Sequence, residues 1–397
     1  MAVIPVKGRE NVFDVVVYTK PTEDAPRRRI TRRVEGKTKA KQLERKLLTD
    51  RDQGKPIEKP LTLGDYATAY LDSRRHGVSA KTLQTYRDVL KWYIAPSIGS
   101  RSLTAVNSMT VRNLYADLTD RGLSAGTVTG VHRVLSMILR AAFEDDLIRR
   151  NPCKSKSVRP RKPQSIGENV ERGLEPAVCK RLLSDLEGTA VYAPSALAAL
   201  TGLRRGEVLA LKWEDVDVDC GELHVNAALE QTRSAVTRQQ PKTKRSRRTV
   251  PLTPAAVVLL RRHKAAQDAL RLRWGAFWSD EGYVFPSARV TQSENGGRLW
   301  TPDAFSNAFR KALTRASERR LAEHVQAAGD VDDFEPWSVG FHEFRHTAAT
   351  TWLRGGTRLE VVSRWLGHAD SAITARVYSH VTAEEHREGV EAVDSLL

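Results

Sequence analysis

A basic, proline-containing stretch at residues 154–165, KSKSVRPRKPQS, does most to limit what this chain can fold into. It has no apolar periodicity, and segments rich in charge and proline behave as linkers rather than as parts of a core. The 397 residues are enough for two or three domains with cores of their own. We therefore expect separate domains on either side of a basic linker over residues 154–169, which could also lie along a phosphate backbone.

Residues 60–153 have the pattern of a helical domain. The segment LTLGDYATAYLDSRR carries its apolar side chains near one face. SAKTLQTYRDVLKWYIAPSIG starts at a serine suited to capping a helix, and we expect its helix to stop before Pro96. Two more amphipathic helices are predicted around MTVRNLYADLTDRG and SAGTVTGVHRVLSMILRAAFEDDLI.

Residues 1–57 predict a small separate module of sheet and helix. FDVVVY at 13–18 and the very basic RRRITRRV at 27–34 have strand composition, with the turn-rich KPTEDAP between them. The following KTKAKQLERKLLTDRDQG fits a helix with its leucines on one side. So small a module is marginally stable, and it is either a surface that docks on DNA or a solvated basic hairpin without a function.

Residues 170–397 predict the largest unit, in which helices alternate with a few strands. WEDVDVDCGELHV at 213–225 is expected to form a hairpin, and KTKRSRRTVPL at 242–252 another strand edge. The whole chain is thus expected to be mixed α/β and mainly α, with a small antiparallel sheet in an α-rich last domain. No glycine-rich phosphate loop is present, so nothing in the sequence supports a nucleotide cofactor, and none is predicted.

The charge balance indicates a polyanionic partner. The formal net charge is +16, from 45 arginines and 19 lysines against 48 acidic residues. Such a field attracts nucleic acid, and arginine is the better bidentate phosphate ligand. A merely soluble basic protein is the plain alternative, whereas a membrane surface is disfavoured because no long apolar run occurs. The start of the chain lacks the apolar core of a signal peptide, and the three cysteines show no C-x-x-C spacing, so an intracellular protein is expected.

The stretch FHEFRHTAATTW at 341–352 has two interpretations. As H-E-x-x-H it would be a zinc-protease helix, with His342 and His346 as ligands and Glu343 as general base. That motif needs a third ligand, yet Trp352 stands six residues after the second histidine, and Arg345 would place a cation beside the zinc. As H-x-x-R it presents an imidazole and a guanidinium one helical turn apart, a pair suited to gripping a phosphate. We favour the second interpretation and expect no metal.

Other short motifs supply similar chemistry in a fixed order. In TGLRRGEVLALKW, Arg204 is followed three residues later by Glu207, whose carboxylate could orient the guanidinium on a helix. PKTKRSRRTVPL offers Lys242 ahead of a run of cations, and WLGHADSAITARVYSH contributes His368 and Tyr378. Each motif alone can be explained by ordinary structural roles, but their combination and order along the chain are specific.

With these motifs the chain resembles the tyrosine recombinase, or phage integrase, family. TGLRRGE matches the family's first-arginine motif, PKTKRSRRTVPL its lysine hairpin, HEFRHT its H-x-x-R box, and LGHAD with VYSH its last two segments. The match spans residues 174–381, within a catalytic domain over 170–397. Residues 60–153 resemble the core-binding domain, and 1–57 the arm-type DNA-binding module of long integrases. Glu343 replaces a commoner aspartate, which creates the zinc-protease string.

The resemblance implies a nucleophile, a phosphate clamp and a supporting residue. Tyr378 would attack phosphorus to give a 3′-phosphotyrosyl link and free a 5′-hydroxyl, without metal or ATP. Arg204 and Arg345 would hold the non-bridging oxygens, with His368 as a further donor, and Glu207 would hold Arg204.

Proton transfer is assigned to two more side chains by the same resemblance. His342 would be the base that takes the phenol proton, and His346 a core or supporting residue. Lys242 would protonate the leaving 5′-oxygen. Lys244 and Arg245 remain alternatives, because the register of a hairpin can slip.

The function implied is site-specific recombination of double-stranded DNA attachment sites by a homotetramer, through a Holliday junction. An arm-binding module suggests integration and excision of a phage or mobile element, with a host DNA-bending protein and a directionality factor as further partners. The expected location is the bacterial cytoplasm, in association with the nucleoid. The alternatives are a type IB topoisomerase and a non-enzymatic helix-turn-helix regulator, the latter suggested by EVVSRWLGHADSAITARVYSHV.

Overall fold

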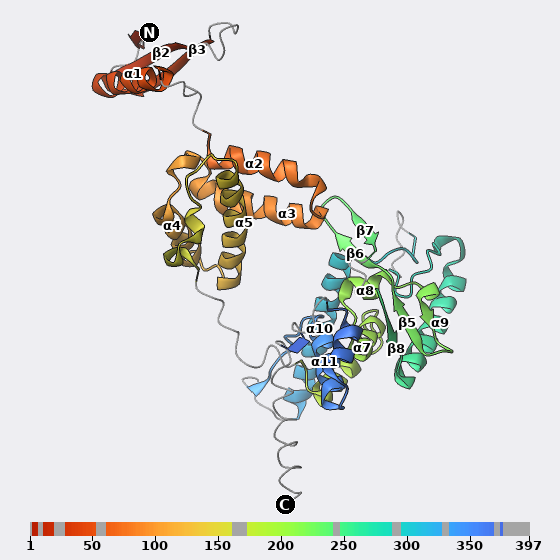
Figure 1. Cartoon of the computed structure of the whole chain (residues 1–397). Coiled ribbons are helices and arrows are strands. Elements are labelled where there is room, and N and C mark those ends of the chain that lie inside the picture. The colour runs from red at the N-terminus through yellow and green to blue at the C-terminus, as the bar shows by residue number, and fades with distance from the viewer. Residues whose placement is uncertain are drawn as a thin grey trace, which may run out of the picture. The chain divides into compact units, whose positions relative to one another are not determined.

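The computed structural model of the protein describes residues 2–6, 11–19, 28–52, 61–160, 173–240, 247–287, 295–327, 333–368 and 374–375. The chain divides into two compact units, Met1–Pro163 and Gln164–Leu397. The boundary between them lies inside the basic stretch that the sequence predicts as a linker. Elements of both units are labelled in Figure 1.

The first residues form the small sheet and helix that the composition predicts (Figure 1). The strands β1 (Ala2–Pro5), β2 (Val12–Thr19) and β3 (Arg28–Glu35) pair antiparallel in that order, and α1 (Lys37–Asp52) follows. The core of this module is small, with Val15, Ala40 and Leu47 buried. Strand β1 was not among the predicted elements, and the predicted turn at 20–26 lies outside the described residues.

The next part of the chain is helical, as predicted. Four helices are α2 (Leu63–Ser73), α3 (Ala80–Val89), α4 (Ser108–Asp120) and α5 (Ala125–Glu144), with 3-10 turns at Arg74–His76, Leu103–Ala105, Pro152–Lys154 and Lys156–Val158. Each helix starts at a polar cap whose side chain accepts a backbone N–H, and the caps are Thr62, Ser79, Asn107 and Ser124. Cys153 and Val158 are buried against the helical core, so this core extends past residue 153 into the predicted linker.

Pro96 does not end the helix that contains it. A π-helix over Leu90–Gly99 continues from α3 and includes the proline. Proline lacks an N–H and its ring clashes with the carbonyl of an ordinary α-helical turn, whereas the wider π turn shifts that carbonyl. Leu90, Ile94 and Ile98 are buried in this segment, so tertiary packing favours the continued helix. The prediction of a stop before Pro96 was wrong for this reason.

The second unit is α-rich with small antiparallel sheets, which confirms the predicted fold class. Its helices are α6 (Pro176–Leu186), α7 (Tyr192–Thr201), α8 (Arg205–Ala210), α9 (Pro254–Trp274), α10 (Pro302–Gln326), α11 (Glu343–Arg354) and α12 (Leu359–Leu366), with 3-10 turns at Trp213–Asp215 and Gly275–Phe277. One sheet has the order β4 (Val216–Asp217), β5 (Glu222–Val225), β8 (Arg248–Pro251), and a separate hairpin pairs β6 (Ala228–Gln231) with β7 (Val236–Gln239). Within the described residues, no helix is long and apolar enough to cross a membrane.

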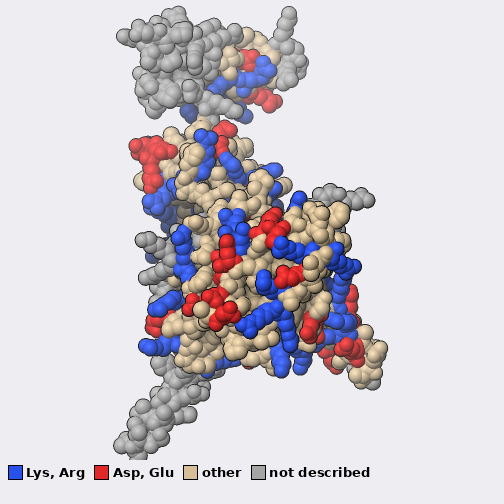
Figure 2. Space-filling model, turned by 90° about the vertical axis from the view of Figure 1, so that its right-hand side faces the viewer, with Lys and Arg blue, Asp and Glu red and all other residues tan. Residues whose placement is uncertain are grey.

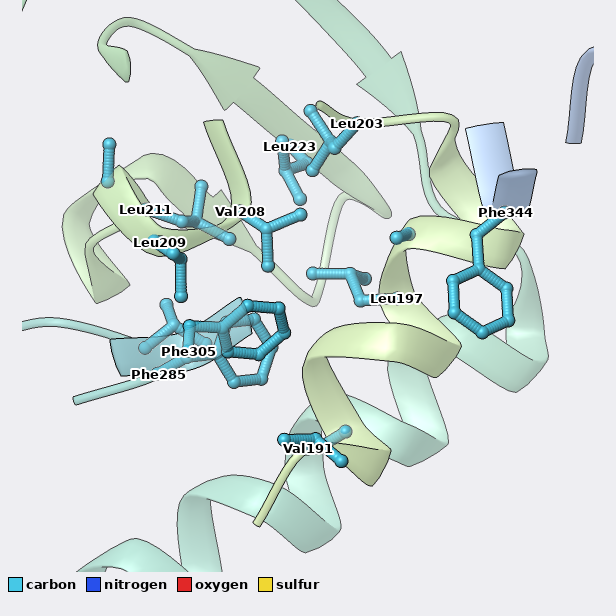
Figure 3. Close-up of a cluster of buried hydrophobic side chains, with 14 of the residues drawn as sticks. Val191, Leu197, Leu203, Val208, Leu209, Leu211, Leu223, Phe285, Phe305 and Phe344 are labelled. Carbon is cyan, nitrogen blue, oxygen red and sulfur yellow. The ribbon is translucent and has the colours of Figure 1, made fainter. Parts of the chain in front are cut away.

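One hydrophobic core joins the elements of this unit (Figure 3). Leu197 from α7, Val208 from α8 and Leu223 from β5 have no more than 1% of their surface exposed. Phe305 of α10 packs edge-to-face on Phe341, with ring centres 5.0 Å apart, just ahead of α11. The starts of α8 and α11, where the predicted site residues lie, are therefore anchored to the same core.

Candidate active site

Glu207 is the centre of the candidate site. It lies in the first turn of α8, and its side chain is only 6% exposed. Its Oε2 accepts the backbone N–H of Arg204 at 2.8 Å, and its Oε1 accepts Nη1 of the same arginine at 3.0 Å. The side chain of Arg204 remains 39% exposed. The predicted pairing of these two residues is thus present, and it caps the helix as well as orienting the arginine.

Arg248, at the start of β8, completes the environment of this carboxylate. Its Nη1 donates to Oε1 of Glu207 at 3.0 Å, and its Nη2 donates to Oε2 at 2.8 Å. Its Nε donates to the carbonyl of Trp365 in α12. The side chain of Arg248 is only 2% exposed. Each oxygen of Glu207 therefore receives two donors, one from each arginine.

Arg345 on α11 is buried beside this group and is 3% exposed. Its Nη1 donates to the carbonyl of Gly202 at 2.7 Å, and its Nη2 donates to the carbonyl of Leu366 at 2.6 Å. Gly202 ends α7 in the left-handed conformation, with φ of 62°. A Cβ at this position would come within 2.9 Å of the Leu366 side chain, so a glycine allows the ends of α7 and α12 to meet at the guanidinium.

His342 and His346 pack edge-to-face at the start of α11. Their ring centres are 5.0 Å apart with the planes at 87°. Oε1 of Glu343 accepts the backbone N–H of Gly340 at 2.8 Å, just ahead of the helix. Among the described residues, no group of three or more His, Cys, Asp or Glu side chains is placed to hold a metal ion.

His368 lies two residues after the end of α12. Its Nδ1 lies 2.7 Å from Oγ1 of Thr374, and Thr374 is completely buried. This contact holds the imidazole ring through Nδ1.

The pKa values of both histidines and of Glu207 are lowered, by burial and nearby cations for the histidines and by the arginines for the glutamate. Desolvation by neighbouring protein atoms, and then the charges of His346 and Arg345, lower the pKa of His342 to about 4. Desolvation and the charges of Arg345 and Arg204 likewise lower the pKa of His368 to about 4. Burial would raise the pKa of Glu207, but Arg248 and the other two arginines hold it at about 2. At neutral pH both imidazoles are neutral and the carboxylate is ionised.

The structure thus brings together five of the seven predicted side chains. They come from three places distant in sequence, the starts of α8 and α11 and the end of α12, and are Arg204, Glu207, His342, Arg345 and His368. Lys242, its alternatives Lys244 and Arg245, and the predicted nucleophile Tyr378 lie outside the described residues.

Two residues of the cluster were missed by the sequence reasoning. Arg248 was hidden in the run KRSRRTV, although strand alternation offered a signal: in RTVP every second residue is buried, so Arg248 points the same way as Val250. Thr374 carried no signal, because nothing in its neighbourhood marks a threonine that binds a histidine.

The charge on the second unit is mixed where Figure 2 displays it: lysine and arginine side chains alternate with acidic ones over the face shown. The concentration of three arginines around one carboxylate is therefore a local feature of the cluster. Two of the three, Arg248 and Arg345, are buried.

The second unit thus gathers three arginines and two histidines around one buried glutamate. The chain belongs to the phage integrase family: residues 174–385 match the model of that family, and residues 63–158 match the phage integrase central domain.

Bacterial recombinases are among its relatives. It is 28% identical over 354 residues to the "Tyrosine recombinase XerC-like" protein of Caldanaerobacter subterraneus subsp. tengcongensis, covering 85% of this chain and 83% of that one. It is 29% identical over 371 residues to an integrase of Streptomyces ambofaciens, covering 89% and 86%.

Solved integrase structures share the fold. The Tn1549 transposon integrase in complex with transposon right end DNA has a TM-score of 0.67 at 20% identity, covering 84% of this chain and 100% of that one. A lambda integrase tetramer bound to a Holliday junction has a TM-score of 0.53 at 16% identity, covering 94% and 96%.

Proposed function

We propose that this chain is a site-specific DNA recombinase of the integrase type, which cleaves and rejoins double-stranded DNA through a 3′-phosphotyrosyl intermediate and a Holliday junction. Family membership supports the class of reaction. The observation that carries the proposal for the site is the convergence of Arg204, Arg345, His342 and His368 around the buried Glu207. Such a cluster suits a phosphodiester whose transition state gathers negative charge.

Tyr378 is the proposed nucleophile. Its phenolic oxygen attacks phosphorus, the bond from phosphorus to the 5′-oxygen breaks, and the protein is left joined to the 3′ end. One phosphodiester replaces another, so the step needs no ATP. The freed 5′-hydroxyl of a partner strand can reverse the reaction and complete strand exchange.

Arg204 and Arg345 are the proposed phosphate clamp. The guanidinium of Arg204 is held by Glu207, and the Arg204 side chain is 39% exposed, which supports a fixed donor that a non-bridging oxygen can reach. Arg345 is held by two backbone carbonyls, which fix its plane before DNA arrives. Donors that are oriented in advance stabilise charge without reorganising in the transition state.

His342 and His368 take different proposed roles in spite of similar pKa values. A neutral His342 can accept the phenol proton, and a bound phosphate, as a neighbouring negative charge, raises its pKa and makes it a stronger base. His368 donates to the phosphate through Nε2–H. For a neutral ring this requires the Thr374 hydroxyl to donate to Nδ1, which the 2.7 Å contact allows.

Lys242 is the proposed acid that protonates the leaving 5′-oxygen, with Lys244 and Arg245 as the alternatives. In the sequence it follows the end of β7 at Gln239 and precedes the start of β8 at Arg248. A lysine in such a connection could approach DNA when the substrate binds.

The biological role we propose is integration and excision of a phage or other mobile element. Relatives described as integrases, and the lambda integrase tetramer on a Holliday junction, support a homotetramer acting on attachment sites. Residues 1–57 are proposed to bind arm-type DNA, 60–153 and 170–397 to bind and cleave the core site, and 154–169 to link them. A host DNA-bending protein and a directionality factor are proposed partners, and the bacterial nucleoid the proposed location.

Covalent trapping tests the proposal. A nicked suicide substrate releases its 5′-hydroxyl fragment after cleavage, so a recombinase or a type IB topoisomerase should accumulate as an SDS-resistant adduct, whereas a helix-turn-helix regulator should give none. Strand exchange between two labelled duplexes then separates recombinase from topoisomerase. Relaxation of supercoiled DNA without any exchange would replace the recombinase by the topoisomerase alternative.

A further inference from the structure

The buried guanidinium of Arg248 joins three elements of the catalytic unit. It belongs to β8, its two terminal nitrogens bind Glu207 in α8, and its Nε binds the carbonyl of Trp365 in α12. Gly367 packs directly against it, since a Cβ there would lie 2.9 Å from Nη1 of Arg248. The close approach requires glycine, whose φ is +66° at this position.

Fold stability alone does not require an ion pair at this place. A buried pair can often be replaced by apolar side chains of similar volume without a decrease in stability, because desolvation offsets the Coulomb attraction. What distinguishes this pair is its partners. Glu207 also holds Arg204, and the Trp365 carbonyl lies three residues before His368.

We propose that Arg248 is a positioning residue. On one side it fixes Glu207, which in turn holds Arg204. On the other side it fixes the end of α12, which carries the chain into His368. The inference rests on the proposed function, because it gives Arg204 and His368 their roles. It adds a residue that contacts neither DNA nor the reacting atoms, but sets the relative placement of two groups that do.

Lysine and methionine substitutions separate the positive charge of Arg248 from the geometry of its hydrogen bonds. Arg248→Lys keeps the positive charge but cannot bind both oxygens of Glu207 and the carbonyl of Trp365 at once. We expect it to fold and to bind core-site DNA within about threefold of the wild type, because the residue is buried. Cleavage on a suicide substrate in a single turnover should fall about 100-fold, the decrease expected for a misplacement of about 1 Å.

Arg248→Met should add a dependence on pH that the wild type lacks. The charged and titratable groups around Glu207 are Arg204, Arg248, Arg345 and His342. With Arg248 removed, burial raises the pKa of Glu207 and only two cations oppose it. As the pH falls from 8 to 5, Glu207 should become protonated and release Arg204, so the cleavage rate relative to wild type should fall progressively.

A substrate with sulfur at the 5′-bridging position shows whether Arg248 acts instead through the segment that carries Lys242. Sulfur leaves without a proton, so it should restore cleavage to Lys242→Ala but not to Arg248→Lys. Full rescue of Arg248→Lys would show that the residue only supports the acid, and would overturn the inference.

Arg320→Met is the matched control for a general decrease in stability. Arg320 is 25% exposed, lies 3.8 Å from a carboxylate oxygen of Asp185, and stacks 4.5 Å above the ring of Trp337, away from the cluster. It should lower Tm without changing the pH profile or the rate per folded molecule. Arg248 variants with the wild-type rate and pH profile, or with rates that merely follow Tm as in the control, would refute positioning. Failure of the wild type itself to form an adduct would instead refute the proposed function.

Discussion

Replacing Glu207 by glutamine should destabilise the catalytic unit and slow cleavage together. Each carboxylate oxygen accepts one donor from Arg204 and one from Arg248. Whichever way the new amide points, its NH₂ group therefore faces two donors. Glutamine also removes the negative charge beside Arg248, whose side chain is only 2% exposed.

The magnitude follows from the pKa of the carboxyl group. Its pKa of about 2, against an ordinary 4.5, corresponds to about 3 kcal/mol at 1.36 kcal/mol per pKa unit. Removing one partner of a buried ion pair costs about 3–5 kcal/mol in other proteins, which agrees. For a unit of this size, 1 kcal/mol shifts Tm by about 2–4 °C, so Glu207→Gln should lower Tm by roughly 6–12 °C.

Thermal unfolding at several pH values tests the sign as well as the size. The pKa of Glu207 is lower in the folded state, so its contribution is complete above pH 4.5 and is lost as the pH falls toward 2. The Tm difference between wild type and Glu207→Gln should thus be constant from pH 8 to 5 and shrink below 4.5.

Asp219→Asn is the control for this substitution. Asp219 pairs with Arg261 but is 87% exposed, so its replacement should barely change Tm. A Glu207→Gln protein with the Tm and the cleavage rate of the wild type would contradict the reasoning.

Three further outcomes are expected. Lys242→Ala should strongly slow cleavage of ordinary DNA but matter much less on a 5′-bridging sulfur substrate; equal decreases on both would reduce Lys242 to a phosphate ligand and direct attention to Lys244. The purified protein should contain far less than one zinc per chain and cleave DNA in EDTA, whereas stoichiometric zinc whose removal stops cleavage would restore the protease interpretation of His342 and His346. A chain starting near Pro60 should still cleave a short core site but fail to recombine a full-length attachment site. The salt dependence of its binding to long DNA should flatten by roughly 0.9 log units per log salt for each phosphate that residues 1–57 neutralise. Full recombination by this shorter chain would remove the arm-binding role.

The fold was largely predictable because local patterns and tertiary packing agree in most segments. The capped amphipathic helices of residues 60–153 and the β-branched strand at 13–18 each follow from neighbouring residues. Pro96 is the exception, since the burial of Ile94 and Ile98 outweighs the local tendency of proline to end a helix. Strand β1 was missed because four residues, AVIP, carry too little pattern.

The motifs of the site could be predicted from the sequence, but the hydrogen bonds between residues of different motifs could not. Arg204 and Glu207 lie three residues apart, so a helix alone brings them together. Arg248 reaches Glu207 across 41 positions and Trp365 across 117, and no local pattern encodes interactions of that range. The same holds for Gly202 and Arg345, which are 143 positions apart.

The measurement that tests the central claim most directly is identification of the residue that carries the DNA. After trapping on a suicide substrate, nuclease and protease digestion leave a peptide with a short nucleotide attached, and mass spectrometry locates the linkage. We expect it on Tyr378, with no adduct from Tyr378→Phe and almost unchanged DNA binding by that variant. A linkage on another residue, or an SDS-resistant adduct that persists in Tyr378→Phe, would contradict the assignment of the nucleophile and with it the proposed mechanism.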